Sequence, residues 1–191
     1  MPPIRLVTVS GPRGAGKETL VNALCAKLAL RRIIPHTTRL PRPGEQDGRE
    51  YHFVSNDRFQ KMIEFEQLIW HTKVGASQRS GTSKAEFRIV EKSIVDITPL
   101  GARALKKKVV LLGGSVLSLA VFADFGERQA RIMRRDPTIT LETACRLMRE
   151  DPASGDRADY VGFDVLIDNN HTDPAPACRC AVEAAAAFLR S

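Results

Sequence analysis

The stretch IRLVTVSGPRGAGKETL, residues 4–20, decides the fold class. Its first part, Ile4 to Val9, is rich in β-branched residues and predicts a buried strand. A glycine-rich turn follows, and apolar residues recurring from Leu20 to Leu28 mark one face of a helix. A strand, a glycine turn and a helix in this order predict the start of an α/β fold.

The glycine turn has the spacing of a phosphate-binding loop, G-x-x-x-x-G-K. Backbone N–H groups of such a loop surround the phosphates of ATP, the helix N-terminus adds a favourable dipole, and the lysine reaches the β- and γ-phosphates. A glycine turn that only packs against its neighbours is the alternative. The residues predicted to bind ATP here are Gly11, Pro12, Arg13, Gly14, Ala15, Gly16, Lys17, Glu18 and Thr19.

Glu18 departs from the loop pattern, which places Ser or Thr after the lysine as a ligand of Mg²⁺. Thr19 supplies a hydroxyl one position later. A carboxylate either binds Mg²⁺, directly or through water, or repels the nucleotide phosphates. The sequence therefore leaves Glu18 or Thr19 as the candidate metal ligand.

The middle of the chain interrupts the buried-strand pattern. Residues 36–54 are polar, basic and broken by proline and glycine, which predicts short strands and turns. Ser55 is expected to cap a helix, LIWHTKV to form a strand, and SGTSK to start another helix. Because Ile94 to Ile97 returns to a buried-strand pattern, this region is interpreted as an insertion between the first and second core strands.

The second half of the chain returns to alternating strands and helices. Core strands are predicted at Ser118–Ala123 and Phe163–Ile167. Helices are predicted at Arg128–Arg135, Leu141–Met148 and Ala181–Leu189. KKKVVLLGG is read as either a strand or a loop.

Composition narrows the class of protein. The 191 residues, 43% hydrophobic and 27% charged, suit one globular domain with a small insertion. A net charge of +7 favours an anionic partner, nucleic acid or a phosphorylated ligand, but no interleaved aromatic and basic pattern supports nucleic-acid binding. The four cysteines are expected to be reduced and buried. No secretory signal or spanning segment is recognisable, so a cytoplasmic protein that does not enter membranes is expected.

Residues 36–55, HTTRLPRPGEQDGREYHFVS, closely resemble the acceptor-binding segment of guanylate kinases. The resemblance implies a P-loop kinase fold with a parallel core sheet, helices on both faces, an acceptor-binding insertion and a lid. It assigns residues 1–34 and 92–191 to the core, with the lid near 131–146, and residues 35–91 to the insertion. Arg39, Arg42 and Tyr51 match the family's acceptor-phosphate residues. Forked guanidinium groups and a phenol are suited to a phosphate dianion.

The resemblance continues more weakly to the C-terminus. Arg131, Arg135 and Arg146 match arginines of the family's lid and neighbouring helix, which close over the transferring phosphoryl group. Phosphoryl transfer depends mainly on such positive charges. Asn169 matches an asparagine that lies by the adenine. The resemblance implies Lys17, Arg39, Arg42, Arg135 and Arg146 as catalytic residues.

Several positions that contact the acceptor's phosphate or read its base differ from the family pattern. Pro35 replaces a serine, and the glutamate that reads guanine falls at Ile69 or His71. Ser80 replaces a tyrosine before the retained Gly81 and Thr82, and the family's aspartate pair becomes Asp96 and Thr98. Ser80, Gly81, Thr82 and Asp96 are kept as candidate substrate residues. Loss of a buried carboxylate reader predicts weaker selectivity for guanine.

The resemblance thus implies an enzyme that converts ATP and GMP to ADP and GDP with Mg²⁺, as a monomer or homodimer. Two alternatives remain open. One is a kinase of another phosphorylated acceptor such as ribose 1,5-bisphosphate, whose enzymes also carry an acidic residue after the loop lysine. The other is a non-catalytic guanylate-kinase-like module that binds phosphorylated protein segments, in which PHTTR is common.

Overall fold

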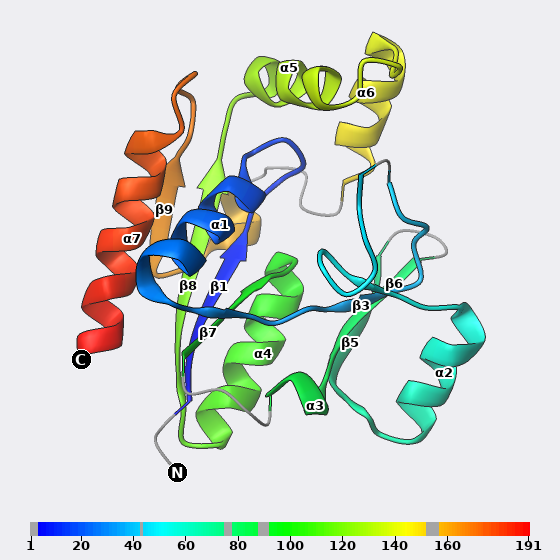
Figure 1. Ribbon diagram of the computed structural model, residues 1–191, viewed down its shortest axis with the longest axis vertical. Coiled ribbons are helices and arrows are strands. Elements are labelled where there is room, and N and C mark those ends of the chain that lie inside the picture. Colours follow the sequence, from blue (N-terminus) through cyan, green and yellow to red (C-terminus); the bar gives the residue numbers. More distant parts are fainter. Residues whose placement is uncertain (1–3, 43, 75–77, 88–91, 152–156) are drawn as a thin grey trace.

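The computed structural model describes residues 4–42, 44–74, 78–87, 92–151 and 157–191. Its core is a five-stranded sheet in which every neighbouring pair is parallel (Figure 1). The strands run in the order β2 (Arg31–Arg32), β7 (Lys92–Asp96), β1 (Arg5–Ser10), β8 (Ser115–Phe122) and β9 (Val165–Asp168). A parallel sheet needs cover on both faces, and this one has it.

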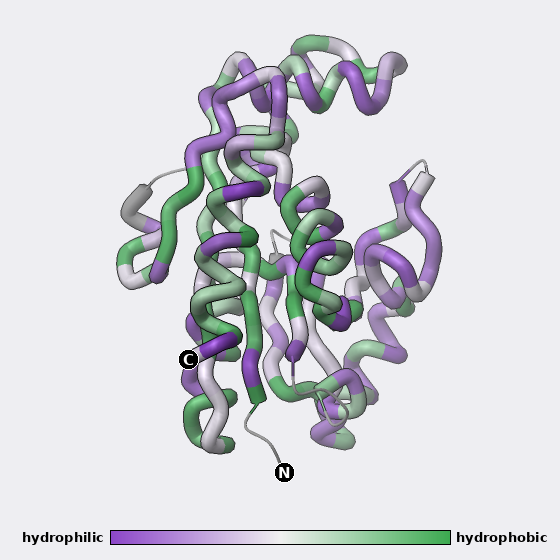
Figure 2. Tube along the Cα trace, turned by 60° about the vertical axis from the view of Figure 1, so that its left-hand side comes forward, coloured by the Kyte–Doolittle hydropathy of each residue, from purple (hydrophilic) through white to green (hydrophobic). Residues whose placement is uncertain are grey.

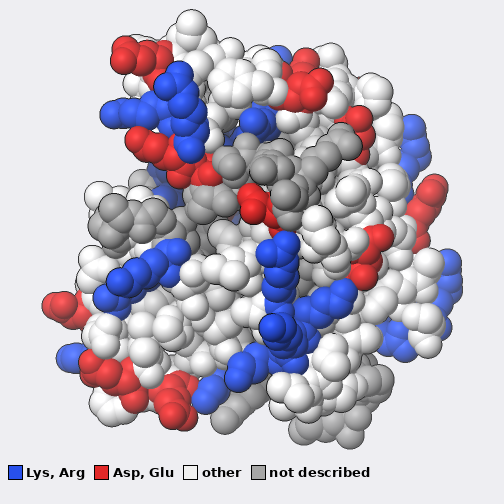
Figure 3. Space-filling view, turned by 180° about the vertical axis from the view of Figure 1, so that it is seen from behind, with Lys and Arg blue, Asp and Glu red and all other residues white. Residues whose placement is uncertain are grey.

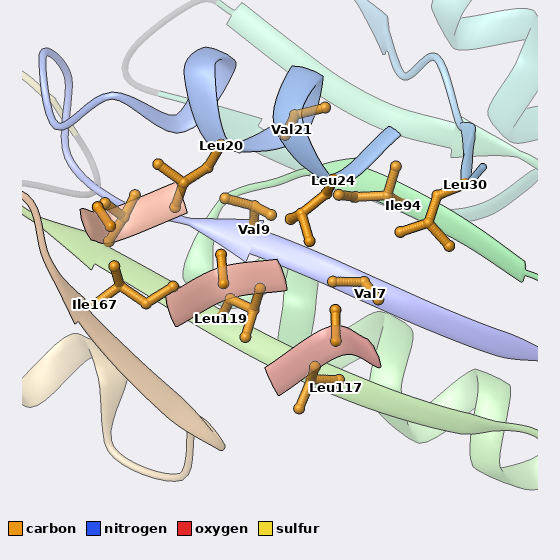
Figure 4. Close-up of a cluster of buried hydrophobic side chains, with 14 of the residues drawn as sticks. Val7, Val9, Leu20, Val21, Leu24, Leu30, Ile94, Leu117, Leu119 and Ile167 are labelled. Carbon is orange, nitrogen blue, oxygen red and sulfur yellow. The ribbon is translucent and has the colours of Figure 1, made fainter. Parts of the chain in front are cut away.

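Helices α1 (Lys17–Leu28) and α7 (Ala175–Arg190) cover one face of the core sheet. Figure 4 shows Leu20 and Leu24 of α1 directed toward Val9 and Leu119 of the central strands. The four side chains are fully buried, and burial of each aliphatic side chain contributes roughly 1.5–3 kcal/mol. This packing fixes the start of α1 relative to the end of β1, where the glycine loop lies.

Helix α4 (Pro99–Leu111) covers the opposite face through a second cluster that contains Ala102, Leu105 and Val109. Figure 3 views the molecule from this side, where Lys and Arg side chains form a column across the middle. Arg103 and Lys107 of α4 are exposed. Figure 2 shows hydrophobic residues concentrated along the central strands. The observed architecture confirms the expected P-loop kinase fold class.

A smaller sheet lies beside the core (Figure 1). Its order is β4 (His52–Phe53), β3 (His36–Thr37), β6 (Gln78–Ser83) and β5 (Leu68–Val74). Helix α2 (Asn56–Glu64) starts as expected at Ser55, whose hydroxyl accepts a hydrogen bond from the Arg58 N–H at 3.1 Å. Phe59 and Met62 of α2 form a small separate core with Leu68.

Two helices, α5 (Phe125–Arg135) and α6 (Leu141–Arg149), project beyond the end of the core sheet at which the glycine loop lies (Figure 1). They pack on each other through Ile132, Ala144 and Met148. The short helices α3 (Lys84–Phe87) and η1 (Arg157–Tyr160) complete the described elements. Among the described helices, none combines the length and apolar character that a membrane crossing requires.

Three sequence expectations were wrong. KKKVVLLGG was expected to be a strand or a loop, but it continues α4 as far as Leu111. The helix extends this far because Leu105 and Val109, four residues apart, both face the sheet and are buried. SGTSK was expected to start a helix, but its first four residues, Ser80–Ser83, belong to β6, where Gly81 pairs with both His36 and His71. The helix begins only at Lys84 and has four residues. All four cysteines are free, as expected, but three are half-buried and Cys180 is exposed.

Candidate active site

The loop between β1 and α1 presents backbone N–H groups. Gly14 and Gly16 have φ angles of 81° and 99°, a left-handed conformation that glycine adopts without steric cost. Gly16 is also the N-cap of α1, and no side chain caps this helix end. The first N–H groups of α1 are therefore available to an anion, and the helix dipole favours negative charge there. This conformation suits polyphosphate binding.

Lys17 and Glu18, the first residues of α1, have different partners. Lys17 Nζ donates hydrogen bonds to the carbonyl oxygens of Gly11 at 2.9 Å and Pro12 at 3.3 Å, so its ammonium group lies across the loop. Glu18 turns toward β2 and accepts hydrogen bonds from Arg32 Nη1 and Nη2 at 2.7 and 2.9 Å. The residue that departs from the loop pattern is thus held in a forked ion pair.

Arg131 and Asn169 support the loop from behind. The Asn169 amide donates a hydrogen bond to the Ala15 carbonyl at 2.8 Å, and a Cβ on Gly16 would lie 2.4 Å from the same amide nitrogen. Arg131 donates to the Asn169 carbonyl at 2.7 Å and, at 3.3 Å, to that of Ala15. Lid helix α5 and the end of β9 therefore fix the loop conformation together.

A cleft of about 640 Å³ connects the glycine loop with the smaller sheet and the lid. Its walls include Lys17, Glu18 and Thr19 from the loop side, and Tyr51 and Ser80 from the smaller sheet. The volume lies within the usual range of small-molecule sites. In the described part of the chain, no group of three or more His, Cys, Asp or Glu residues is arranged to hold a metal.

Seven arginines line this cleft, and four of them interact electrostatically: Arg13, Arg39, Arg42 and Arg135. Burial, together with the charges of Arg13 and Arg39, lowers the pKa of Arg42 to about 10. Burial and the charges of Arg135 and Arg39 also lower the pKa of Arg13, against the opposing charge of Asp151. The positive charges of these guanidinium groups therefore repel one another. An anion bound among them relieves that repulsion.

Glu45 organises the acceptor side of this cluster. Its carboxylate accepts hydrogen bonds from both terminal nitrogens of Arg39, at 2.8 and 3.1 Å, and from the Arg42 backbone N–H at 2.8 Å. The Arg39 guanidinium also lies 5.3 Å from the ring centroid of Tyr51 and 5.5 Å from that of Phe53. Arg39 is thus held between an acid and two aromatic rings at the cleft wall.

Tyr51 and Asp96 occupy the deeper part of the cleft. Burial and the nearby Asp96 charge raise the pKa of Tyr51 to about 12, so its phenol stays protonated and can donate a hydrogen bond. Burial likewise raises the pKa of Asp96, while the positive charges of Lys17 and Arg32 lower it. The cleft floor therefore combines a phenol donor with a carboxylate compensated by two cations.

Comparison with known proteins places the chain in a family. The sequence model of the guanylate kinase family, described as "Guanylate kinase", matches residues 3–178. The chain belongs to the guanylate kinase family. Guanylate kinase from Alkalilimnicola ehrlichii is 33% identical over 176 residues, which cover 90% of this chain and 83% of that protein. Guanylate kinase from Coxiella burnetii is 34% identical over 178 residues, covering 89% and 82%.

The crystal structure of guanylate kinase from Anaplasma phagocytophilum supports the same fold. It superposes with a TM-score of 0.64 at 18% identity, covering 97% of this chain and 85% of that chain. The family and the fold expected from residues 36–55 and from the glycine loop are both confirmed.

Some residues matched to the guanylate kinase pattern lie away from the cleft wall. Thr82 is buried and accepts a hydrogen bond from Trp70 Nε1 at 2.9 Å, which gives it a structural role. Gly81 is also buried, and a Cβ there would lie 2.8 Å from the Trp70 carbonyl oxygen. Arg146 is exposed on α6, and Asn169 lies behind the loop; neither lines the cleft. Arg131, Arg135, Ser80 and Asp96 do line it.

The departures from the family pattern also have positions in the structure. Ile69 lies at a register shift of β5 and packs against the α4 cluster, and His71 is exposed and does not line the cleft. Neither candidate position for the guanine reader thus supplies a cleft carboxylate. The Thr98 hydroxyl accepts the Gly101 N–H at 3.2 Å and caps α4.

Three residues of the site were missed in the sequence. Arg32 and Glu45 form the ion pairs described above, and the Asp151 carboxylate accepts a hydrogen bond from the Arg13 backbone N–H. Arg32 and Asp151 are distant in sequence from their partners, and no motif marks them. Glu45 could have been found from its proximity to Arg39 and Arg42 in a proline- and glycine-broken segment.

Proposed function

We propose that this member of the guanylate kinase family transfers the γ-phosphoryl group of ATP to a nucleoside monophosphate, with GMP as the family acceptor. The observation that carries the proposal is the convergence of Arg13, Arg39, Arg42 and Arg135 on the cleft that begins at the glycine loop. Two phosphorylated ligands would meet there. Phosphoryl transfer needs positioning and positive charge more than a strong base.

Each side of the cleft has a distinct task in this proposal. The loop N–H groups and Lys17 hold the triphosphate, and Arg39, Arg42 and Tyr51 hold the acceptor phosphate. Arg13 and Arg135 lie close enough to Arg42 to lower its pKa, so they are placed to stabilise charge that develops between the two ligands. The acceptor phosphate is itself nucleophilic, so no side chain must remove a proton in advance.

Mg²⁺ fits the oxygen-rich loop end of the cleft, where Thr19 and Asp96 offer oxygen atoms. When bound, Mg²⁺ supplies charge neutralisation of the nucleotide phosphates. Both Glu18 oxygens already accept hydrogen bonds from Arg32, so Thr19 and Asp96 are the better candidates among the loop-end residues.

We also propose that guanine selectivity is weakened. The phosphate-handling residues Arg39, Arg42 and Tyr51 line the cleft, whereas Ile69 packs against the α4 cluster and the exposed His71 does not line the cleft. A site without its carboxylate reader loses much of its discrimination between bases. Ser80 and Gln78 are the polar side chains of β6 that line this region.

An ADP-release assay with GMP, AMP, CMP, UMP and ribose 1,5-bisphosphate as acceptors tests this function. ADP formation with GMP and at least one other monophosphate supports both parts of the proposal. ADP formation with ribose 1,5-bisphosphate alone would reassign the acceptor. If a phosphorylated peptide binds while none of these acceptors yields ADP, the non-catalytic alternative replaces it.

A further inference from the structure

The loop end of the cleft brings together two acidic and two basic side chains from three separate elements. Lys17 and Glu18 begin α1, Arg32 lies on β2, and Asp96 ends β7. All four side chains line the cleft. Burial raises the pKa of Asp96, and the positive charges of Lys17 and Arg32 oppose this shift, so the two cations partly offset the two carboxylates.

The Glu18–Arg32 contact has the geometry of a strong ion pair. Two parallel N–H···O hydrogen bonds of 2.7 and 2.9 Å join the guanidinium to the carboxylate. The Arg32 side chain is 18% exposed, and the Glu18 side chain is 51% exposed. Arg32 is held in place by its strand, which pairs with β7 at Ile94. The arginine is therefore the fixed partner, and the more exposed glutamate is drawn toward it.

The position of Glu18 makes this pairing consequential. Glu18 stands where the loop pattern places a neutral hydroxyl beside the phosphates. A free carboxylate there would repel the like charge of a triphosphate at short range. Pairing with Arg32 compensates that charge and engages both carboxylate oxygens.

We propose that Arg32 is a positioning residue that makes the acidic loop competent to bind ATP, by neutralising Glu18 and holding it off the phosphate and metal sites. The inference rests on the ATP binding proposed above. It assigns a role to a residue pair that replaces the usual loop hydroxyl, and it predicts that the two residues act as one unit. Removing Arg32 is expected to be harmful only while Glu18 is present.

Calorimetric titration with ATP, in EDTA and in MgCl₂, tests this unit in five proteins: wild type, Arg32→Ala, Glu18→Ser, the double variant and Arg31→Ala. Arg31 is the matched control, because it is the adjacent exposed arginine and its contact, at 3.6 Å, is to Glu86. Arg32→Ala is expected to weaken ATP binding about tenfold, or ~1.4 kcal/mol. The double variant is expected to bind within about threefold of Glu18→Ser, and Arg31→Ala as the wild type.

A thermal melt of each variant separates loss of binding from loss of folding. The inference is overturned if a folded Arg32→Ala binds ATP as tightly as the wild type. It is also overturned if the double variant binds as weakly as Arg32→Ala, because Arg32 would then contact the nucleotide itself. Failure of the wild type to bind ATP contradicts the proposed function directly, and that result needs no variant.

Glu18→Gln provides a second readout that concerns the metal. This variant keeps the shape of the side chain and removes its charge. If Glu18 is held by Arg32, the gain in ATP affinity on adding MgCl₂ is expected to match that of the wild type within about threefold. Loss of that gain in Glu18→Gln would identify Glu18 as a metal ligand and overturn the inference.

Discussion

Glu45 accepts two hydrogen bonds from the Arg39 guanidinium, at 2.8 and 3.1 Å, at the wall of the acceptor side of the cleft. Both side chains are only 15% exposed. An arginine expected to hold a phosphate is thus already oriented by a carboxylate and two aromatic rings. Such orientation reduces the entropy lost when the phosphate binds.

Arg39→Ala is therefore expected to weaken binding of every monophosphate acceptor, whatever its base. Loss of a charge-assisted contact costs about 1.5–3 kcal/mol, which is roughly a 10- to 100-fold loss in affinity. Competition binding with GMP, AMP and CMP measures this change. Arg58→Ala, an exposed arginine on α2, is the control and is expected to bind as the wild type. Tight binding of GMP alone by the wild type would contradict the account of base selectivity.

Lys17→Met is expected to weaken ATP binding. The lysine amine now bridges the Gly11 and Pro12 carbonyls and would exchange these contacts for phosphate oxygens. Removing one charge-assisted contact costs about 1.5–3 kcal/mol. Calorimetry of the variant against the wild type measures the loss, and an unchanged affinity would argue against ATP binding by this loop.

The sequence predicts the loop and the parallel core well because their signals are local. Glycine spacing and buried β-branched runs identify β1 and α1 without reference to the rest of the chain. KKKVVLLGG carries no clear helical pattern of its own, because its lysines and its apolar residues are each consecutive. Only packing on the sheet shows that Val109, like Leu105 one turn earlier, faces inward. The Glu18–Arg32 pair depends on the register of β2 against β7, which no local pattern contains.

Thr82→Val is expected to destabilise the protein while leaving acceptor affinity within about twofold of the wild type. Its hydroxyl accepts the hydrogen bond of the buried Trp70 indole at 2.9 Å. An unpaired buried N–H costs about 1–3 kcal/mol. Urea unfolding measures the stability, and GMP titration measures the affinity. A large loss of affinity in a stable variant would restore Thr82 as a substrate contact.

His36 is expected to make the protein less stable in mild acid. Burial, together with the charge of His52, lowers the pKa of His36 to about 4 from its ordinary 6.5. The unfolded chain takes up the proton first, so the stabilising contribution is fully present above pH 6.5 and is lost as the pH falls toward 4. Solvent screening of this half-buried ring reduces the effect to about 1 kcal/mol between pH 7 and 5.

Urea unfolding of His36→Gln at these two pH values checks this expectation. The variant is expected to lose less stability between pH 7 and 5 than the wild type. His171→Gln, at an exposed position, is the control and should keep the wild-type pH dependence. Equal slopes for His36→Gln and the wild type would contradict the role given to His36.

Glu18→Ser restores the hydroxyl that the loop pattern places beside the metal and the phosphates. In the wild type, Arg32 engages both Glu18 oxygens, and Thr19, which with Asp96 is the remaining candidate metal ligand, lies one position later in the helix than the hydroxyl of the loop pattern. The wild type is therefore expected to be a slow enzyme, and Glu18→Ser is expected to form ADP several-fold faster. The gain should be largest at low Mg²⁺, where a better metal ligand matters most. ADP formation by both proteins over a magnesium titration measures it. A serine variant that is slower at every concentration would mean that the paired glutamate itself supports the reaction, with Arg32 held beside Asp96 by a contact that serine cannot make.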